Sequence, residues 1–222
     1  MKQTLKFLLF LLPIIFITSC ADKAEYEAII ITGQNTHDWE TTHDRLKKIL
    51  ENSQLFKVDV EIIKEGKAKT FTCDFNNYHV VIMDYNGETW PDKTKKRFEE
   101  YINNGGGLVV FSDANGAFSE WKAYKEIVGL GSWNPKPTAA NTYVTWKNGK
   151  TTKRNISGMT SRFPLVTEFK IDTRNREHPI TDGLPASWLH TKDMLQCGLA
   201  GPAKNINLLA TAYCDTALEH GT

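Results

Sequence analysis

Short apolar runs recur along the first half of this 222-residue chain. Continuous apolar runs at 28–32, 80–83 and 108–111 are typical of strands that are covered on both faces. The stretch 56–60 instead alternates apolar and polar residues, as a strand does when one of its faces meets solvent. The pattern therefore predicts four strands, of which the one at 56–60 lies nearer an edge of the sheet.

Amphipathic segments separate and follow these strands, with apolar residues at helical spacing in 38–50, 92–103 and 118–128. Asp38 is a candidate N-cap for the first helix. The glycines in 104–107 follow a helix and precede a strand, so they indicate a helix C-cap rather than a phosphate loop. Strands that alternate with helices predict a doubly wound, mainly parallel α/β sheet of the flavodoxin-like type.

The pattern weakens after residue 129. Residues 131–162 are rich in Gly, Pro, Asn, Lys and Trp, and have room for one hairpin. Alternation returns at 169–171, and the run 207–212 predicts a last buried strand. Because the chain then ends in turn-like polar residues, we expect one domain over 28–222 that is incomplete at its C-terminus.

The N-terminus has the pattern of an export signal. A basic start precedes an apolar run at 7–17, which is too short for a stable membrane span. The run ends in Ile-Thr-Ser-Cys, which looks like a bacterial lipobox, so 1–20 is predicted to be a lipoprotein signal with Cys20 as the lipidated residue. An ordinary signal peptide is the alternative. Residues 21–27 would be a tether, and the protein would be exported and held on a membrane by its acyl chains.

Composition excludes several classes of function. The 27 Lys and Arg residues nearly balance 26 Asp and Glu residues, which argues against a nucleic-acid partner. Beyond Cys20 there are only Cys73, Cys197 and Cys214, an odd number without zinc-site spacing, although one disulfide with a spare thiol remains open. We expect no cofactor, and His37 with His190 lacks the spacing that would favour a divalent metal.

Polar and aromatic residues gather where three of the predicted strands end. They are Asn35, His37, Asp38 and Trp39 after the first strand; Asp84, Asn86 and Trp90 after the next; and Ser112, Asp113, Asn115 and Trp121 after the last. Ligands of open parallel sheets bind beyond the carboxyl ends of the strands. Carboxylates, amides and aromatic faces together suit a small-molecule sugar, because hydroxyls bond to the polar groups and apolar sugar faces rest on the rings.

Within this set, His37, Asp38 and Asp113 are the candidates for acid–base catalysis. Asp38 is also explained by helix capping, and Trp121 by a place in the core. Ser112 lacks the glycines of a nucleophile elbow, so a nucleophilic serine is not favoured.

Several longer stretches resemble one family of proteins. They are "TGQNTHDWETT", "YNGETW", "YINNGGGLVVFSDANGAFSEWKAYKEIVGLGSW", "EHPITDGLPASWLHTKD" and "GPAKNINLLATAY". In this order they resemble the ThuA-like, or trehalose-utilisation, family over roughly residues 28–222. The resemblance implies a class I glutamine amidotransferase-like fold and a role in disaccharide breakdown through keto-sugars. It also marks His178, His190 and Asp193 as ligand-binding residues.

Three positions depart from what the resemblance implies. Ser112-Asp113-Ala114 stands where the family usually has His-Ala-Ala, and Met194 and Gln196 replace a usual Glu and Tyr. A His-Gly pair is missing around 159–163. No cysteine occupies the elbow, so glutamine hydrolysis is not expected. Two main hypotheses follow: an exported enzyme acting on a disaccharide or its keto form, or a sugar-binding module without catalysis. An inactive remnant is the third.

Overall fold

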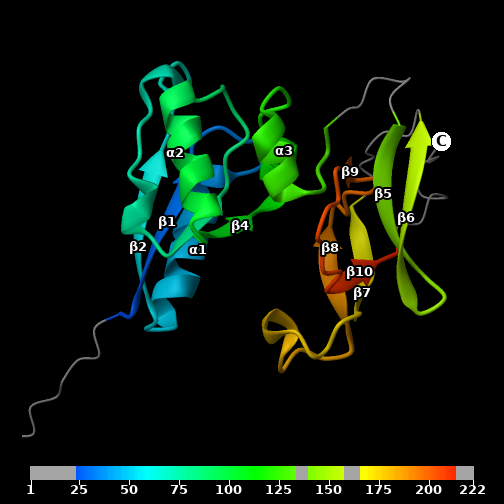
Figure 1. Ribbon diagram of the computed structural model, residues 1–222. Helices are drawn as coiled ribbons and strands as arrows, with labels where there is room; N and C mark the ends of the chain where they lie inside the picture. The colour runs from blue at the N-terminus through cyan, green and yellow to red at the C-terminus, as the bar shows by residue number, and fades with distance from the viewer. Residues whose placement is uncertain (1–23, 134–139, 158–165, 214–222) are drawn as a thin grey trace, which may run out of the picture.

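A four-stranded parallel sheet organises the first half of the protein in the computed structural model, which describes residues 24–133, 140–157 and 166–213 (Figure 1). Its strands are β1 (Tyr26–Thr32), β2 (Phe56–Ile62), β3 (Val80–Met83) and β4 (Gly107–Val110). Their order is β2-β1-β3-β4, and all three neighbouring pairs are parallel. The predicted flavodoxin-like α/β sheet is confirmed, and so is the edge position of β2.

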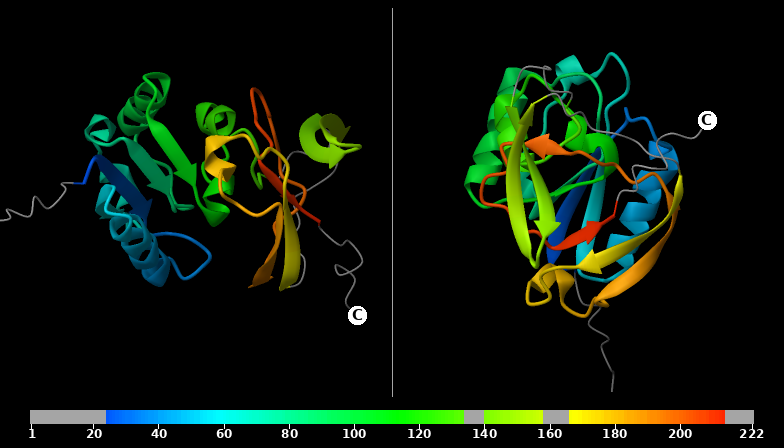
Figure 2. Two further views of the ribbon diagram at one scale, coloured as in Figure 1. Left: turned by 90° about the horizontal axis from the view of Figure 1, so that it is seen from below. Right: turned by 90° about the vertical axis from the view of Figure 1, so that its right-hand side faces the viewer.

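Helices cover both faces of this sheet: α1 (Trp39–Asn52) lies on one face, and α2 (Asp92–Asn103) and α3 (Lys122–Val128) lie on the other (Figure 2). Successive side chains of β1 point to opposite faces. Ala28 and Ile30 therefore belong to a small cluster that packs against α1. Ile29 and Ile31 belong to a larger cluster that includes residues of α2 and α3. A strand that is apolar on both faces is thus buried on both.

Aromatic rings dominate the larger cluster. Trp90, only 1% exposed, lies at its centre, with ring centroids of Phe71 and Phe118 at 4.8 and 5.0 Å. The ring of Trp121 lies 6.0 Å from that of Trp90. Tilted and edge-on pairs of this kind contribute about 0.5–1.5 kcal/mol each beyond burial. Trp90 and Trp121 therefore serve the core first.

Some element boundaries differ from those predicted. β1 begins at Tyr26, so the end of the expected tether 21–27 is already part of the sheet. The third helix begins at Lys122 rather than 118, because Phe118 has a positive φ of 52° that breaks the helical path. Gly105, with φ 93°, follows the Asn104 C-cap of α2, which confirms the capping role of these glycines.

The second half consists mainly of antiparallel strands, of which the sequence indicated one hairpin, the alternation at 169–171 and a strand over 207–212. That hairpin is β5 (Ala140–Lys147) and β6 (Lys150–Ser157), and β9 (Ala200–Gly201) joins it in the order β6-β5-β9. A second sheet has the order β10-β7-β8, with β7 (Thr167–Thr173), β8 (Ser187–Asp193) and β10 (Ala210–Ala212). The strand predicted over 207–212 forms only at Ala210–Ala212, as β10, and it is half-buried rather than buried.

Four short 3₁₀ helices complete the described elements: Ala68–Thr70, Phe75–Asn77, Ser112–Gly116 and Pro179–Thr181. None of the helices in the described ranges is both long and apolar enough to cross a bilayer. The predicted signal, Cys20 and most of the tether lie outside the described residues.

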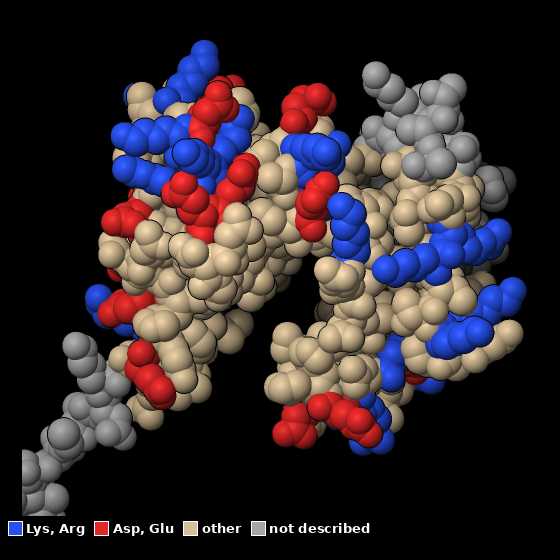
Figure 3. Space-filling view, viewed as in Figure 1, with Lys and Arg blue, Asp and Glu red and all other residues tan. Residues whose placement is uncertain are grey.

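The two halves meet along the end of α3. Gly131 and Ala200 form a β-bridge, the backbone N–H of Ala203 donates to the carbonyl of Gly129 at 2.9 Å, and Lys204 pairs with Glu126 at 3.5 Å. The carboxyl ends of the parallel strands point toward the second half (Figure 2). An open cleft separates the two halves below this junction (Figure 3). The strand ends therefore lie where a ligand can reach them.

Candidate functional site

The loop after β1 turns sharply because a glycine occupies its first position. Gly33 has φ 123°, and a Cβ there would lie 2.5 Å from the carbonyl oxygen of Ile63. The backbone N–H of Ile63 donates to the carbonyl of Thr32 at 2.8 Å, which fixes this close approach. Residues 34–38 then cross the carboxyl edge of the sheet before α1 begins.

Asp84 follows β3 directly and has no exposed surface. The hydroxyl of Thr32 donates to its Oδ2 at 3.0 Å, and the amide of Asn35 donates to its Oδ1 at 3.3 Å. Burial raises the pKa of the Asp84 carboxyl above its ordinary value, and the neighbouring His37 and these hydrogen bonds oppose that rise. A buried carboxyl with a raised pKa at a strand end is typical of a functional site.

His37 lies against this carboxyl. Its Nε2 is 3.0 Å from Oδ1 of Asp84, the distance of an ion pair. The ring N–H is not aligned for a hydrogen bond, and among the described residues neither ring nitrogen has a hydrogen-bond partner although both atoms are buried. The ring of Phe111, at the end of β4, lies edge-on at 6.1 Å. Buried polar atoms without a partner indicate a place for a ligand or a water molecule.

The end of β4 contributes the third side of the site. The hydroxyl of Thr36, next to His37, donates to the carboxylate of Asp113. Ser112 is exposed and has a φ of 50°, so the chain turns abruptly between Phe111 and Asp113. The structure therefore brings together residues from the ends of β1, β3 and β4, with His37 and Asp84 at the β1/β3 position where ligands of this strand order bind.

A second set of contacts joins the loops after β1 and β3. The backbone N–H of Asn86 donates to the carbonyl of Gln34 at 2.7 Å, and Oε1 of Gln34 accepts from the N–H of Glu88 at 3.2 Å. The Glu88 carboxylate in turn accepts from the N–H of Gly66 at 2.7 Å. These bonds hold the loop that carries His37 in a fixed place beside Asp84.

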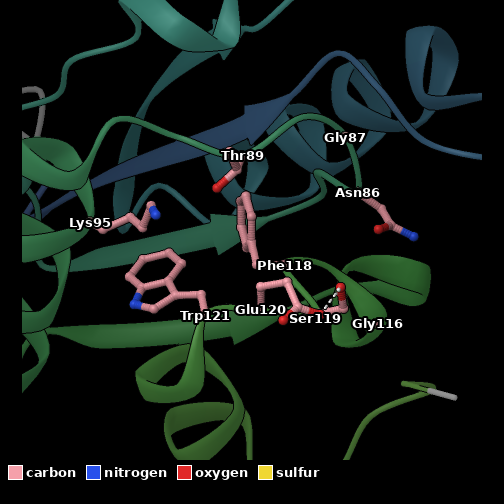
Figure 4. Close-up of a pocket in the computed structure, with 9 residues that line it drawn as sticks. All are labelled: Asn86, Gly87, Thr89, Lys95, Gly116, Phe118, Ser119, Glu120 and Trp121. Carbon is pink, nitrogen blue, oxygen red and sulfur yellow. Dashed lines mark hydrogen bonds between the residues drawn. The ribbon is translucent and has the colours of Figure 1, made fainter. Parts of the chain in front are cut away.

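A pocket of about 330 Å³ opens beyond Asn86, between the loops that follow β3 and β4 (Figure 4). Its lining includes the predicted site residues Asn86 and Trp121. Nε1 of Trp121 donates to Glu99 at 2.6 Å, which fixes the indole in place. Trp90 lies in the core and does not line this pocket, and its Nε1 has no partner among the described residues.

Several predicted site residues have structural contacts instead. Asp38 is the N-cap of α1, where hydrogen bonds from Thr41 hold the pKa of its exposed carboxyl below the ordinary value. The Trp39 ring lies over His43 at 6.1 Å. Asn115 links the two halves, because its amide donates to Gln196 at 2.6 Å and its oxygen accepts from the N–H of Ser132 at 3.1 Å.

The three residues marked by the family resemblance in the second half are held by their neighbours. His178 caps the last 3₁₀ helix by accepting from the N–H of Ile180 at 3.2 Å. His190 stacks on Phe169 at 4.7 Å, and Asp193 accepts from the N–H of Met194 at 2.7 Å. Within the described ranges no hydrogen bond or ion pair joins any of the three to the His37 site.

Neither a metal cluster nor a reactive thiol is found in the described ranges. No group of three or more His, Cys, Asp or Glu side chains there could hold a metal ion. Cys73 is free, and burial raises its pKa to about 12, so it is a poor nucleophile at neutral pH. Sequence reasoning missed Thr32 and Thr36, although a polar residue at the end of an apolar run was a usable signal for Thr32.

Comparison with known proteins agrees with this fold. The ThuA family model, described as trehalose utilisation, matches residues 27–220. A solved thua-like protein from Parabacteroides merdae is 40% identical and has a TM-score of 0.80, covering 87% of this chain and 70% of its own. One from Bacteroides uniformis, 20% identical with a TM-score of 0.55 and covering 88% and 71%, supports the fold alone. None of the curated proteins matches.

Proposed function

This chain belongs to the ThuA, or trehalose utilisation, family, and on that premise we propose that it binds a disaccharide or its keto form at the carboxyl edge of the parallel sheet, where His37 transfers a proton. The family indicates a role in sugar utilisation. The identity of the ligand and the proton transfer by His37 are what we propose, and the contacts around Asp84 support both.

One observation carries the proposal. His37 has two buried ring nitrogens without a hydrogen-bond partner among the described residues, and one of them lies 3.0 Å from a fully buried carboxyl. A carboxylate beside one ring nitrogen can balance the positive charge that develops on the imidazole when the other nitrogen accepts a proton from a substrate. A sugar hydroxyl, or a carbon next to a keto group, would supply that proton.

Asp113 is the second proton-transfer candidate in this proposal. It comes from a different strand end and is tied through Thr36 to the segment that carries His37. Asp38 has a smaller part than the sequence indicated, because its carboxylate already caps α1. His37 and Asp84 therefore form the central pair, and Asp113 borders it.

His37→Asn tests the catalytic role, with trehalose and its keto form as substrates and mass spectrometry to detect products. A positioned acid–base group contributes about 10²–10⁴-fold to a rate, so turnover should fall by that factor while the melting temperature stays within a few degrees. His79→Asn is the matched control, because His79 lies at the opposite end of the sheet, where it accepts from the N–H of Glu27. Its turnover should equal that of the wild type.

Equal rates in wild type and His37→Asn would refute proton transfer by His37. Saturable sugar binding by the wild type without any product would instead favour a sugar-binding module that has lost catalysis. The replacement of the usual family histidine by Ser112, which is exposed at the strand end, is the observation behind that second candidate. If the wild type binds neither sugar, the remaining hypothesis is that the protein is an inactive remnant of the family.

We also propose that the protein is exported and anchored to a membrane through acyl chains on Cys20. The support is the residue pattern alone: a basic start, a short apolar run and the Ile-Thr-Ser-Cys sequence. Such an anchor would place the sugar site outside the cytoplasm.

A further inference from the structure

The pocket beside the His37 site has walls of two kinds. Phe118 and Trp121, each 8% exposed, form the apolar part. Asn86 and Thr89 contribute polar side chains that have no hydrogen-bond partner among the described residues, and Ser119 adds a hydroxyl. Lys95 and Trp121 lie at one end of the pocket, Asn86 and Gly87 at the other, and the ring of Phe118 between them (Figure 4).

The charges of the pocket indicate an uncharged ligand. The Lys95 ammonium lies 2.8 Å from Oδ1 of Asp92, so its positive charge is already balanced. Glu120, the other charged residue of the lining, is exposed. A phosphate or a carboxylate would therefore find no unpaired cation there. Hydroxyl groups, in contrast, can donate to Glu120 and Asn86 and accept from Lys95.

The size of the pocket suits a single sugar ring. Its volume of about 330 Å³ is at the lower end of the range of small-molecule sites, roughly 300–1,000 Å³. An apolar wall together with several unpaired polar groups is the combination that binds one pyranose, with its C–H face on the rings and its hydroxyls on the polar side chains.

The pocket and the His37 site share their supporting elements. Asn86 lies two residues beyond Asp84, and its backbone N–H donates to Gln34 in the loop that carries His37. Gly116, on the opposite rim, ends the 3₁₀ helix that begins at Ser112 and contains Asp113. The two sites therefore lie along one edge of the sheet and are held by the same loops.

We propose that this pocket is the subsite for the second, non-reacting ring of a disaccharide, with Asn86, Thr89 and Trp121 as the residues that select two-ring sugars over one-ring sugars. This inference rests on the proposed function, because it assumes that the reacting ring lies at His37. Binding energy from the non-reacting ring would then hold the reacting ring in place.

Thr89→Trp tests the subsite, because the indole would fill the pocket from an exposed position. Calorimetric titrations with trehalose and glucose compare wild type, Thr89→Trp, Asn86→Ala and His37→Asn. Lys93→Trp, which adds the same bulk at an exposed position of α2 outside the lining, is the matched control. We expect Thr89→Trp to weaken trehalose binding at least tenfold, to the level of glucose, and Asn86→Ala to weaken it severalfold. Lys93→Trp should keep the wild-type affinity.

Each outcome has a separate meaning. Wild-type trehalose affinity in both Thr89→Trp and Asn86→Ala would overturn the subsite, while a loss of turnover in His37→Asn would still support the proposed function. If the wild type binds neither sugar, both proposals fail together. If Thr89→Trp no longer unfolds cooperatively, the trehalose affinity of Asn86→Ala alone tests the subsite, since that change only removes an amide at the pocket rim.

Discussion

Asp84 supports both the fold and the site, so truncating its side chain should lower the stability of the protein. Asp84→Ala leaves the Thr32 hydroxyl, which is fully buried, without its partner, at about 1–3 kcal/mol. Asn35 and His37 also lose their contact, and water can replace part of it at the half-buried Asn35, whereas the ring nitrogens of His37 are buried. Removing the carboxyl also removes the free-energy cost of burying it, which offsets part of this loss. We expect the free energy of unfolding to fall by roughly 2–4 kcal/mol.

Urea unfolding followed by tryptophan fluorescence measures this change, and the melting temperature should fall by about 5–15 °C for a chain of this size. Asp84→Asn is the control, because it keeps the volume and one oxygen that can accept from Asn35. Its free energy of unfolding should lie within about 1 kcal/mol of the wild type. A loss below about 1 kcal/mol in Asp84→Ala would refute the anchoring role of this carboxyl.

The raised pKa of Asp84 adds a dependence on pH. Its folded pKa lies above that of the unfolded chain, so its contribution to stability is fully present below the unfolded value of about 3.9. That contribution is lost as the pH rises through the folded value. The difference in unfolding free energy, wild type minus Asp84→Asn, should therefore decrease as the pH rises from about 3 to 7. An increase over that range would show that pairing with His37 outweighs burial.

Two further predictions concern the turn after β1 and the anchor. Gly33→Ala should destabilise the protein by roughly 2–5 kcal/mol, since its Cβ would meet the Ile63 backbone and φ is positive. In the same urea assay, Gly66→Ala should cost about 1 kcal/mol, because Gly66 has φ 76° but open space around it. Equal losses of stability in the two variants would contradict the steric argument. Cells fed labelled palmitate should label the wild type and Cys73→Ser but not Cys20→Ser, and label on Cys20→Ser would exclude Cys20 as the anchor.

The sequence by itself determined the elements of the parallel sheet. Apolar periodicity is a local property: β1 and β3, which are covered on both faces, are continuously apolar, and the edge strand β2 alternates. The apolar run of β4 also predicted a strand, although β4 lies at the other edge of the sheet and is only half-buried. The cap at Asp38 and the glycines after α2 follow from equally local rules. Because ligands of parallel sheets bind beyond the carboxyl ends of the strands, the sequence also predicted where the site lies.

Tertiary structure decided which of those residues meet. Thr32 and Asp84 are 52 positions apart, and only the parallel pairing of β1 with β3 brings them and His37 together. Trp90 was predicted to bind ligand, but packing among the aromatic rings on that face made it part of the core, whereas Trp121 belongs to the same cluster and also lines the pocket. Most of the antiparallel strands of the second half were missed because β7, β8 and β10 are only partly buried, so that few of their positions must be apolar. Local sequence pattern determines the strands and helices of the parallel sheet, whereas contacts between distant segments determine which side chains form the site.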